Sequence, residues 1–422
     1  MFAIFKNRQK YGSYFANYLE YLKSYKNKDL RTITNAQLDE FINYSCNNSE
    51  FYRQFKSCSI REFPVISKNE IIKSGYSNII GKPYKIRHSS GSTGNPFMVP
   101  VTKRVYQLEY AFIEFHRSFV NAKKEYKIAT FGGHKVAYIN SNKPPFWIYN
   151  YCNNQIIFSS YHLSKKNLKY YCKELNKFKP NILHGYPSSL YIIAKYVLEN
   201  NLKLYFKPEM IQTGSETLLD FQRKAIEAAF DCKVYNWYGN TELCGHITEC
   251  QYSKLHVQPL HSFIRILNKK NLDSNPGETG RIVATNFNNL CFPLINYDTK
   301  DVAKIASDQS CKCGQSGLIL DSIDGRIEDY ILLPDGRKIG RLDHVFKNTK
   351  NVNKAQIEQK NITAIIIHID KNKKYSSKDE QEILKKIKAR VGNQINIIFD
   401  YDTEIQKEAN GKFRFIKQDL KS

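Results

Sequence analysis

The sequence has no apolar run long enough to cross a bilayer, so its composition argues against a membrane-spanning protein. A secretory signal is also missing, because Lys6, Arg8 and Lys10 interrupt the apolar residues at the amino terminus. Internal repeats are absent, and the only biased tracts are short clusters rich in lysine and asparagine, which are typical of solvated loops. We therefore expect a cytoplasmic chain of 422 residues that divides into two or three domains.

Acidic residues are in deficit, with 40 Asp and Glu against 64 Lys and Arg, for a formal net charge of +24. The lysines are scattered along the whole chain and accompany abundant Asn, Ile and Tyr, a mixture that an AT-rich genome produces. This pattern favours a basic surface without a specific nucleic-acid partner, and it leaves peripheral association with anionic lipid open. Most of the 10 cysteines are isolated, as expected of reduced thiols in a cytoplasm.

The apolar residues follow helical spacing in the first 80 residues or so and alternate between strand-like and helix-like segments after Lys85. Strands are indicated by KIATFGG, PNILHGY, PEMIQTGSE and KVYNWYGNTE, each of which ends in polar loop residues. Helices are indicated by SSLYIIAKYVLENN, with Ser188 or Ser189 as its cap, and by LLDFQRKAIEAAF. Alternating strands and helices predict an α/β fold whose ligands bind where strands end in loops.

The pattern of apolar and polar residues changes after Ile327. There NITAIIIHID, SKDEQEILKKIKARVG and QINIIFDY indicate a strand, a helix and a strand. This unit is long enough for a small separate domain, and DGRIEDY just before it is a candidate hinge. We therefore predict one domain over residues 1–327, with a helical segment over about 1–80, and a second domain over residues 328–422.

A small polar loop lies within RHSSGSTGNPFMVPVT, between two predicted structured segments. Its glycines permit close approach of the backbone to a ligand, and its hydroxyls add donors beside the free N–H groups of a turn. Such a loop suits a nucleoside triphosphate, although a flexible surface loop explains the same residues. The glycine spacing and the missing Gly-Lys-Ser/Thr ending exclude a Walker A loop. The loop residues are Ser89, Ser90, Gly91, Ser92, Thr93 and Gly94.

Further motifs follow this loop in a fixed order. They are TGSE (213–216), YNWYGNTE (235–242), YDTKD (297–301), DGRIEDY (324–330) and NGKFRF (410–415). The ordered set resembles the adenylate-forming enzymes, the acyl-CoA synthetase and ligase superfamily. It is most similar to the branch of phenylacetate–CoA ligases and of CapK proteins of capsular polysaccharide biosynthesis, with HGYPSSL and CKCG as branch-like features. The likeness runs from roughly Pro64 to Lys417. It implies a large multi-sheet α/β amino-terminal domain and a small, mobile α+β carboxyl-terminal domain.

The resemblance implies an AMP-forming ligase in which a carboxylate attacks the α-phosphorus of ATP, releasing pyrophosphate and leaving an acyl-adenylate. In this scheme Glu242 binds Mg²⁺, Thr241 is a phosphate-side hydroxyl, and Lys412 brings a mobile catalytic cation. Asp301 accepts the ribose hydroxyls, Tyr238 lies against adenine, and Arg326 reaches the ribose from the hinge. The remaining nucleotide-binding residues that the resemblance implies are those of the polar loop together with Gly214, Ser215, Glu216 and Gly239.

The chain departs from the family pattern at several motif positions. Asn95 stands where the family often has lysine, Asp298 stands where the Tyr-Arg-Thr-x-Asp motif has arginine, and Glu328 replaces the usual hinge aspartate. Neither lost cation removes the residues that bind Mg²⁺ or ribose, or the catalytic lysine, so we interpret the chain as an active enzyme.

Some of the cysteines form a second constellation, in which Cys250, His256, Cys311 and Cys313 supply three thiols and an imidazole. Such a set satisfies a tetrahedral, structural Zn²⁺ site without an open position. Unrelated reduced side chains are the alternative interpretation. Cys244 and His246 are nearby competitors, and His246 is also placed to face the substrate. Members of the resembled branch carry a metal in this region.

The acceptor of the acyl group is the least determined part of the prediction. The CapK-like character favours an amine on a sugar nucleotide or glycan in capsule or O-antigen synthesis, whereas a phenylacetate-type ligase would use CoA. The residues His134, His184 and Tyr186 follow predicted strands and are candidates for the acyl pocket or for plain core packing. A non-catalytic scaffold of a polysaccharide assembly complex is the alternative from a different class.

Overall fold

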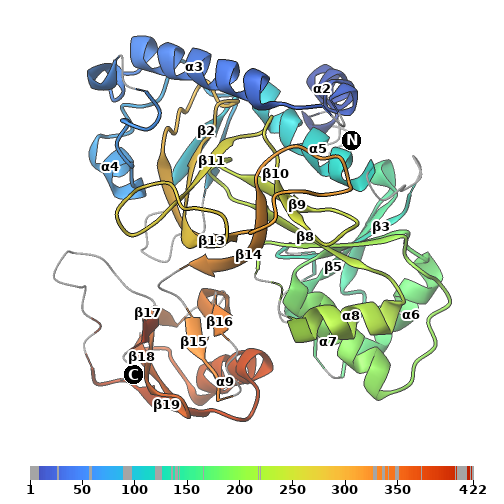
Figure 1. Ribbon diagram of the computed structural model, residues 1–422. Coiled ribbons are helices and arrows are strands. Elements are labelled where there is room, and N and C mark those ends of the chain that lie inside the picture. Colours follow the sequence, from blue (N-terminus) through green and yellow to red (C-terminus); the bar gives the residue numbers. More distant parts are fainter. Residues whose placement is uncertain are drawn as a thin grey trace. The chain divides into compact units, whose positions relative to one another are not determined.

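The structure is a computed structural model, shown in Figure 1. It describes residues 9–25, 28–56, 59–88, 97–118, 126–134, 136–137, 141, 143–164, 166–216, 218, 220–326, 330–334, 338–340, 342–346, 351–371, 373–403, 405, 416–418 and 420. The described residues form two compact units, the first ending at Ile323 and the second beginning at Asp324. Within this described part, no helix is both long and apolar enough to span a membrane.

The described strands of the first unit build one twelve-stranded sheet, ordered β11-β12-β13-β14-β10-β9-β8-β7-β6-β3-β5-β4, and a two-stranded sheet of β1 and β2. Their bounds are β1 (Lys85–His88), β2 (Met98–Val101), β3 (Ile128–Gly132), β4 (Trp147–Asn150), β5 (Gln155–Ser159), β6 (Ile182–Gly185), β7 (Met210–Gly214), β8 (Val234–Gly239), β9 (His246–Glu249), β10 (Leu255–Val257), β11 (Phe263–Leu267), β12 (Thr279–Thr285), β13 (Tyr297–Ile305) and β14 (Ile319–Arg326). This mixed α/β architecture confirms the predicted fold class.

The helices of this unit include the amino-terminal ones that the sequence predicted. They are α2 (Ser13–Ser24), α3 (Arg31–Asn48), α4 (Lys68–Lys73), α5 (Lys103–Ser118), α6 (Leu168–Phe178), α7 (Pro187–Glu199) and α8 (Asp220–Phe230), with 3₁₀ turns η1 (Arg53–Phe55), η2 (Tyr151–Asn153) and η3 (Ser160–His162). The predicted serine cap of α7 is wrong. Tyr186 is the N-cap and Pro187 occupies the first turn, where the fixed φ of proline suits a helix start and its missing N–H costs nothing.

The parallel strands β5, β3, β6, β7 and β8 form the part of the sheet that carries most of the motifs. Alternate residues on these strands point to opposite faces. Leu183, Ile211 and Val234 belong to an apolar core with residues of α6, α7 and α8, which lie together against these strands in Figure 1. The opposite face carries a small apolar cluster of Ile128, Ile182, Met210 and Tyr235 near the amino ends of the strands. Polar residues follow farther along the same face, where Gln212 bonds to His116 of α5. The polar part of this face, toward the carboxyl ends of the strands, is available for chemistry.

An irregular buried segment joins β12 to β13 and is held by side-chain amides. The Nδ2 of Asn286 donates to the carbonyl of Phe292 at 3.1 Å, and its Oδ1 accepts from the N–H of Leu294 at 2.8 Å. The Nδ2 of Asn289 donates to the carbonyl of Pro100 at 3.0 Å, and that of Asn296 donates to two further backbone carbonyls. These amides replace the backbone ladder that a buried loop lacks, so the segment delivers β13 in a defined position.

The second unit contains a four-stranded sheet ordered β19-β18-β17-β20 and a hairpin of β15 and β16. Its elements are β15 (Tyr330–Leu332), β16 (Lys338–Gly340), η4 (Leu342–Val345), β17 (Val352–Asn361), β18 (Ala364–Lys371), α9 (Ser377–Val391), β19 (Asn396–Asp400) and β20 (Ile416–Gln418). The predicted strand, helix and strand correspond to β18, α9 and β19. Helix α9 ends before Gly392, whose φ of 78° lies in the region that glycine adopts without strain.

Candidate functional site

The loops that follow β6, β7 and β8 lie at one edge of the sheet, because these strands are parallel. Gly214 ends β7 so close to β8 that an added Cβ would lie 2.8 Å from the carbonyl oxygen of Trp237. Only glycine fits that approach, and Ser215 follows it with a φ of 66°. Thr213 is buried, and its hydroxyl donates to Oδ1 of Asn236 at 3.4 Å. The predicted adenine-side loop thus turns sharply over the end of β8.

Tyr238 and Asp301 come from separate motifs and meet in the structure. The hydroxyl of Tyr238 donates to Oδ2 of Asp301 at 2.7 Å, and both residues are buried. Burial and the neighbouring Asp301 carboxylate raise the pKa of Tyr238 well above its usual value, so the phenol stays protonated and keeps donating. Two residues to which the resemblance assigns nucleotide contacts are therefore locked to each other across strands β8 and β13.

The turn after β8 carries Thr241 and Glu242. Asn240 shapes this turn, since its Oδ1 accepts from the N–H of Cys244 at 2.9 Å. The carbonyl of Glu242 is 3.4 Å from Nδ2 of Asn286, in the amide-held segment before β13. Glu242 is buried; burial raises the pKa of the neighbouring Cys244 thiol, and the charge of Glu242 adds to that rise. The residue that the resemblance assigns to Mg²⁺ therefore follows Tyr238 by four positions, and its backbone carbonyl is held by the segment before β13.

The departure at Asp298 has a structural counterpart. Asp298 is buried, and its Oδ2 contacts Nη1 of Arg281, a residue of the neighbouring strand β12. The same oxygen lies 2.8 Å from Nζ of Lys300. The motif position that usually holds a cation thus holds an anion between two cations. The net charge of this group of side chains remains positive.

Several predicted residues lie outside the described part of the chain or at its margin. The polar loop from Ser89 to Gly94, together with Asn95, lies outside the described residues, and so do Glu328 and Lys412. Arg326 is the last residue of β14. The roles assigned to these residues stay predictions.

A chain of hydrogen bonds crosses the polar face of the sheet beneath α5. His116 donates from Nε2 to the carbonyl of Glu249 at 2.8 Å, so its Nδ1 accepts from Nε2 of Gln212 at 2.9 Å. The Oε1 of Gln212 then accepts from Nδ1 of His184 at 3.1 Å. Burial lowers the pKa of His116 to about 4 and that of His184 to about 3, so both rings are neutral at pH 7. The chain fixes the tautomer of His184 and leaves its Nε2 as an acceptor.

The three residues predicted for the acyl pocket lie at the carboxyl ends of β3 and β6. His184 is in β6, Tyr186 follows it directly, and His134 follows β3. The charge of His134 contributes to lowering the pKa of His184, which places the two rings near each other. The sequence contained no signal for most partners of these residues: His116 and Gln212 belong to no motif beyond their place in a helix or strand, and only Trp237 lies within the YNWYGNTE segment.

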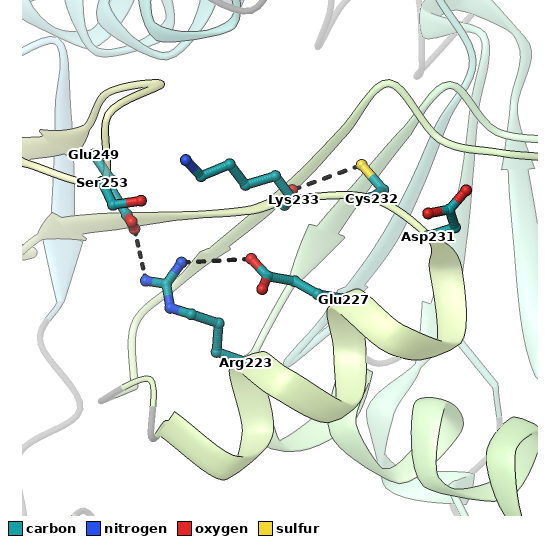
Figure 2. Close-up of a pocket in the computed structure, with 7 residues that line it drawn as sticks. All are labelled: Arg223, Glu227, Asp231, Cys232, Lys233, Glu249 and Ser253. Carbon is teal, nitrogen blue, oxygen red and sulfur yellow. Dashed lines mark hydrogen bonds and ion pairs between the residues drawn. The ribbon is translucent and has the colours of Figure 1, made fainter.

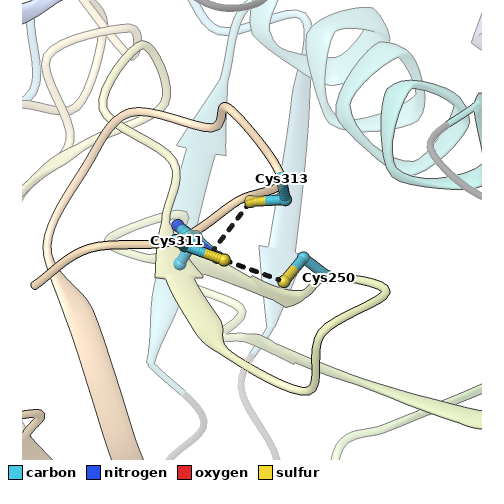
Figure 3. Close-up of side chains that lie close together, drawn as sticks. Cys250, Cys311 and Cys313 are labelled. Atoms are coloured by element: carbon cyan, nitrogen blue, oxygen red, sulfur yellow. Dashed lines mark hydrogen bonds between the residues drawn. The ribbon is translucent and has the colours of Figure 1, made fainter. Parts of the chain in front are cut away.

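The four predicted zinc ligands come together, as Figure 3 shows for the cysteines. Cys250 follows β9, His256 is in β10, and Cys311 and Cys313 lie between β13 and β14. The Sγ atoms of Cys250 and Cys311 are 3.7 Å apart, and Sγ of Cys313 is 3.3 Å from Nε2 of His256. Tetrahedral Zn²⁺ with bonds of about 2.3 Å to sulfur and 2.0 Å to nitrogen requires about 3.8 Å between two sulfurs and about 3.5 Å between a sulfur and a nitrogen. The donor set and its spacing fit a tetrahedral metal ion.

The electrostatics of this cluster also suit a metal. Burial lowers the pKa of His256 to about 4 and raises that of Cys313 to about 12, so at pH 7 the imidazole is already a neutral ligand and the thiol is protonated. The N–H of Gln315 points to Sγ of Cys313 at 3.4 Å, a contact that stabilises a thiolate once a metal displaces the proton.

A surface cavity of about 540 Å³ lies elsewhere on the first unit and is drawn in Figure 2. It is lined by Arg223, Glu227, Asp231, Cys232, Lys233, Glu249 and Ser253. Lys233 precedes β8, so this cavity is at the end of the strand opposite to the motif loops. Arg223 is already bonded to Glu249 at 2.8 Å and lies 3.8 Å from Glu227. The cavity is separate from the motif site.

Comparison with known proteins shows a similarity to CapK. A family model described as the CapK C-terminal domain matches residues 331–419. Protein CapK of Staphylococcus aureus is 29% identical over 432 residues, which cover 97% of this chain and 94% of CapK.

Solved structures extend the likeness to the whole fold. A crystal structure of 2-hydroxyisobutyryl-CoA ligase in the postadenylation state, in complex with R3-HIB-AMP, gives a TM-score of 0.58 at 14% identity and covers 92% of this chain and 89% of that one. The same ligase with 2-HIB-AMP and CoA in the thioesterification state gives a TM-score of 0.55 at 14% identity, with the same coverage. The chain is therefore a homologue of CapK that carries a CapK C-terminal domain and has the fold of the adenylate-forming ligases.

Proposed function

We propose that this chain activates a carboxylic acid with ATP and passes the acyl group to an amine or thiol in surface-polysaccharide biosynthesis. The observation that carries this proposal is the hydrogen bond between Tyr238 and Asp301, which joins two adenylation motifs at a strand end. A buried carboxylate fixed in this way is prepared to accept the ribose hydroxyls of a nucleotide. The homology with CapK supports the polysaccharide context.

The reaction follows from the roles assigned to the residues. An oxygen of the substrate carboxylate attacks the α-phosphorus of ATP, and the bond to the leaving pyrophosphate breaks. Glu242 would hold Mg²⁺, which neutralises phosphate charge, and Thr241 would donate to a phosphate oxygen. The adenine would lie between the Gly214–Glu216 turn and the Tyr238 ring. Lys412 would bring a positive charge to the reacting carboxylate, and Arg326 would contact the ribose.

Two kinds of acceptor for the acyl group agree with the similarity to CapK and with the fold. An amine on a sugar nucleotide or glycan is the first choice because CapK is the full-length relative. CoA is the second, because the 2-hydroxyisobutyryl-CoA ligase with this fold was crystallised with CoA. Consumption of the CoA thiol or of the acceptor amine during turnover, with release of AMP, distinguishes them directly.

We also propose that Cys250, His256, Cys311 and Cys313 bind a structural Zn²⁺. The separations of their donor atoms support this assignment. A bound ion would join the turn after β9 and strand β10 to the segment before β14, and it would leave no coordination position for substrate.

The test of the main proposal is ATP–pyrophosphate exchange with a panel of carboxylic acids. Glu242→Ala and Asp301→Ala should each lower the exchange rate by orders of magnitude, whereas Glu40→Ala, at an exposed position of α3, should leave it unchanged. Near-normal exchange in both active-site variants would refute the nucleotide assignment. Absence of exchange with every acid would favour a non-catalytic scaffold.

A further inference from the structure

A buried polar cluster outside all the motifs lies on the α5 face of the sheet. Glu109 belongs to α5, His246 begins β9, and His261 precedes β11. One ring nitrogen of each histidine and one carboxylate oxygen of Glu109 lie within 4.8 Å of one another. The rings of Phe112 and Trp237 pack against His246 at centroid distances of 5.2 and 5.5 Å. Two aromatic rings thus pack against the cluster, and one polar atom of each of its three residues lies close to the others.

The proton on His246 can be placed from its neighbour. The indole Nε1 of Trp237, which can only donate, is 3.3 Å from Nδ1 of His246. Nδ1 must therefore hold a lone pair, and the proton of the neutral ring is on Nε2. Burial lowers the pKa of His246 well below its usual value, so the ring is neutral. His246 is 1% exposed, and its Nε2 has no hydrogen-bond partner within the described part of the chain.

Glu109 supplies a hydrogen-bond acceptor, in contrast to the N–H donor of His246. Its Oε1 accepts from Nε2 of His261 at 2.7 Å, and Nδ1 of His261 then accepts from the hydroxyl of Ser262 at 3.2 Å. His261 therefore orients the Glu109 carboxylate, which retains capacity to accept a further hydrogen bond. The cluster presents one N–H donor and one carboxylate acceptor side by side.

A ligand hydroxyl group can pair with both side chains, because its one oxygen can accept a hydrogen bond from the N–H of His246 and donate one to the carboxylate of Glu109. An oxygen that accepts from an N–H at about 2.9 Å and donates to a carboxylate at about 2.7 Å joins two atoms about 4.6 Å apart. A ring nitrogen of His246 and a carboxylate oxygen of Glu109 lie within 4.8 Å of each other, which agrees with such a separation. A divalent cation fits less well, because it needs a lone pair on the nitrogen of His246 that the Trp237 indole leaves protonated. An apolar group would leave the buried donor unpaired.

The cluster adjoins the proposed adenylation site. His246 pairs with Gly239 of the Tyr-Gly-x-Thr-Glu motif across β8 and β9. Burial raises the pKa of the Cys244 thiol, and the charges of Glu242 and Glu109 both add to that rise, so both carboxylates lie near this thiol. A substrate whose carboxylate reacts near Glu242 would therefore extend its body toward His246.

We propose that the acid activated by this chain carries a hydroxyl group, which is recognised by His246 as donor and Glu109 as acceptor. That the ligand is the activated acid rests on the proposed function. That a hydroxyl group binds at this site rests only on the side chains of the cluster. His261 acts as a positioning residue through Glu109.

The kinetic test compares hydroxy acids with their deoxy counterparts, such as 3-hydroxybutyrate with butyrate and 4-hydroxyphenylacetate with phenylacetate, in ATP–pyrophosphate exchange. The hydroxy member of a productive pair should have a kcat/KM at least about tenfold higher, since a site built to bond a hydroxyl leaves buried groups unpaired with the analogue. His246→Phe and Glu109→Gln should each remove most of this preference, mainly by raising KM for the hydroxy acid. The control His162→Phe changes another buried histidine, stacked on Phe146, and should leave the preference intact.

A second measurement does not depend on turnover. Long-range ¹H–¹⁵N spectra of the wild type should show His246 as the Nε2–H tautomer, and Trp237→Phe should release that constraint. Exchange without a hydroxyl preference would overturn the substrate class while leaving the proposed function in place. The Nδ1–H tautomer, or the loss of about one equivalent of Zn²⁺ in His246→Phe relative to wild type, would overturn the site itself, even if no acid supports exchange.

Discussion

The hydrogen bond between Tyr238 and Asp301 should have a measurable effect on the stability of the first unit. Tyr238→Phe keeps the ring and removes the hydroxyl that donates to Oδ2 of Asp301 at 2.7 Å. Both residues are more than nine-tenths buried, so water cannot replace the lost donor. A hydrogen bond to a charged group contributes about 1.5–3 kcal/mol, and we expect the free energy of unfolding to fall by about 2 kcal/mol.

Urea unfolding monitored by tryptophan fluorescence measures this unit selectively. The sequence has 2 tryptophans, and both Trp147 and Trp237 belong to strands of the first unit. With a slope of about 2–3 kcal/mol per molar urea, the midpoint should fall by about 0.7–1 M. A double-mutant cycle with Asp301→Asn should give a coupling energy of about 1.5–3 kcal/mol.

The matched control is Tyr171→Phe. Its hydroxyl is also buried and donates at 2.7 Å, but to the backbone carbonyl of Ser159. Tyr171→Phe should destabilise the unit by about 1 kcal/mol, and its effect should add to that of Asp301→Asn without coupling. A coupling energy for Tyr238 and Asp301 below about 0.5 kcal/mol would refute the reasoning, because the two groups would then not interact in solution.

Three other predictions concern the metal, the second unit and pH. Purified protein should contain about one Zn²⁺ per chain by elemental analysis, and Cys311→Ser with Cys313→Ser should abolish it; a metal-free but fully stable wild type would contradict the site. Lys412→Ala should abolish adenylate formation yet permit acyl transfer from supplied acyl-adenylate. Glu328→Pro should instead slow acyl transfer and spare ATP–pyrophosphate exchange. If both variants lose the same half-reaction to the same degree, the second unit does not move between the two steps. Because burial lowers the pKa of His116 to about 4, its contribution to stability is present above pH 6.5 and is lost as pH falls toward 4, at about 1.4 kcal/mol per pH unit. His116→Gln should remove that part of the slope, and equal slopes in urea titrations of the two proteins would show the opposite.

The strands and loops of the site were predictable because their positions along the chain depend mainly on local composition. Fully buried strands such as β7 read as short apolar runs, and the residues that must turn at their ends are small or polar. Gly214 is required by the close approach of β8, which a strand-to-loop pattern already suggests. The motif order then led to Asp301, which no periodicity identifies.

The partners of these residues were not predictable, because they depend on register and on packing between distant segments. Glu109 meets His261 across 152 positions, and His116 meets Gln212 across 96. No spacing rule connects a helix residue to a strand residue that far away. The cap of α7 was wrong for a local reason, since serine and proline compete for the start of a helix and proline takes the first turn.

The amide-held segment before β13 has a consequence for the chemical ageing of the protein. Asn286, Asn289 and Asn296 each present an NH₂ group to backbone carbonyl oxygens. Hydrolysis of such an amide would replace the donor with a carboxylate, and an unpaired buried charge would then face the lone pairs of those carbonyls. Because the segment leads directly into β13, which carries Asp301, a single spontaneous deamidation there would disturb the position of that strand. An asparagine-rich composition therefore has a structural consequence for this chain: at these positions, loss of one amide removes a hydrogen bond that orders the segment before β13.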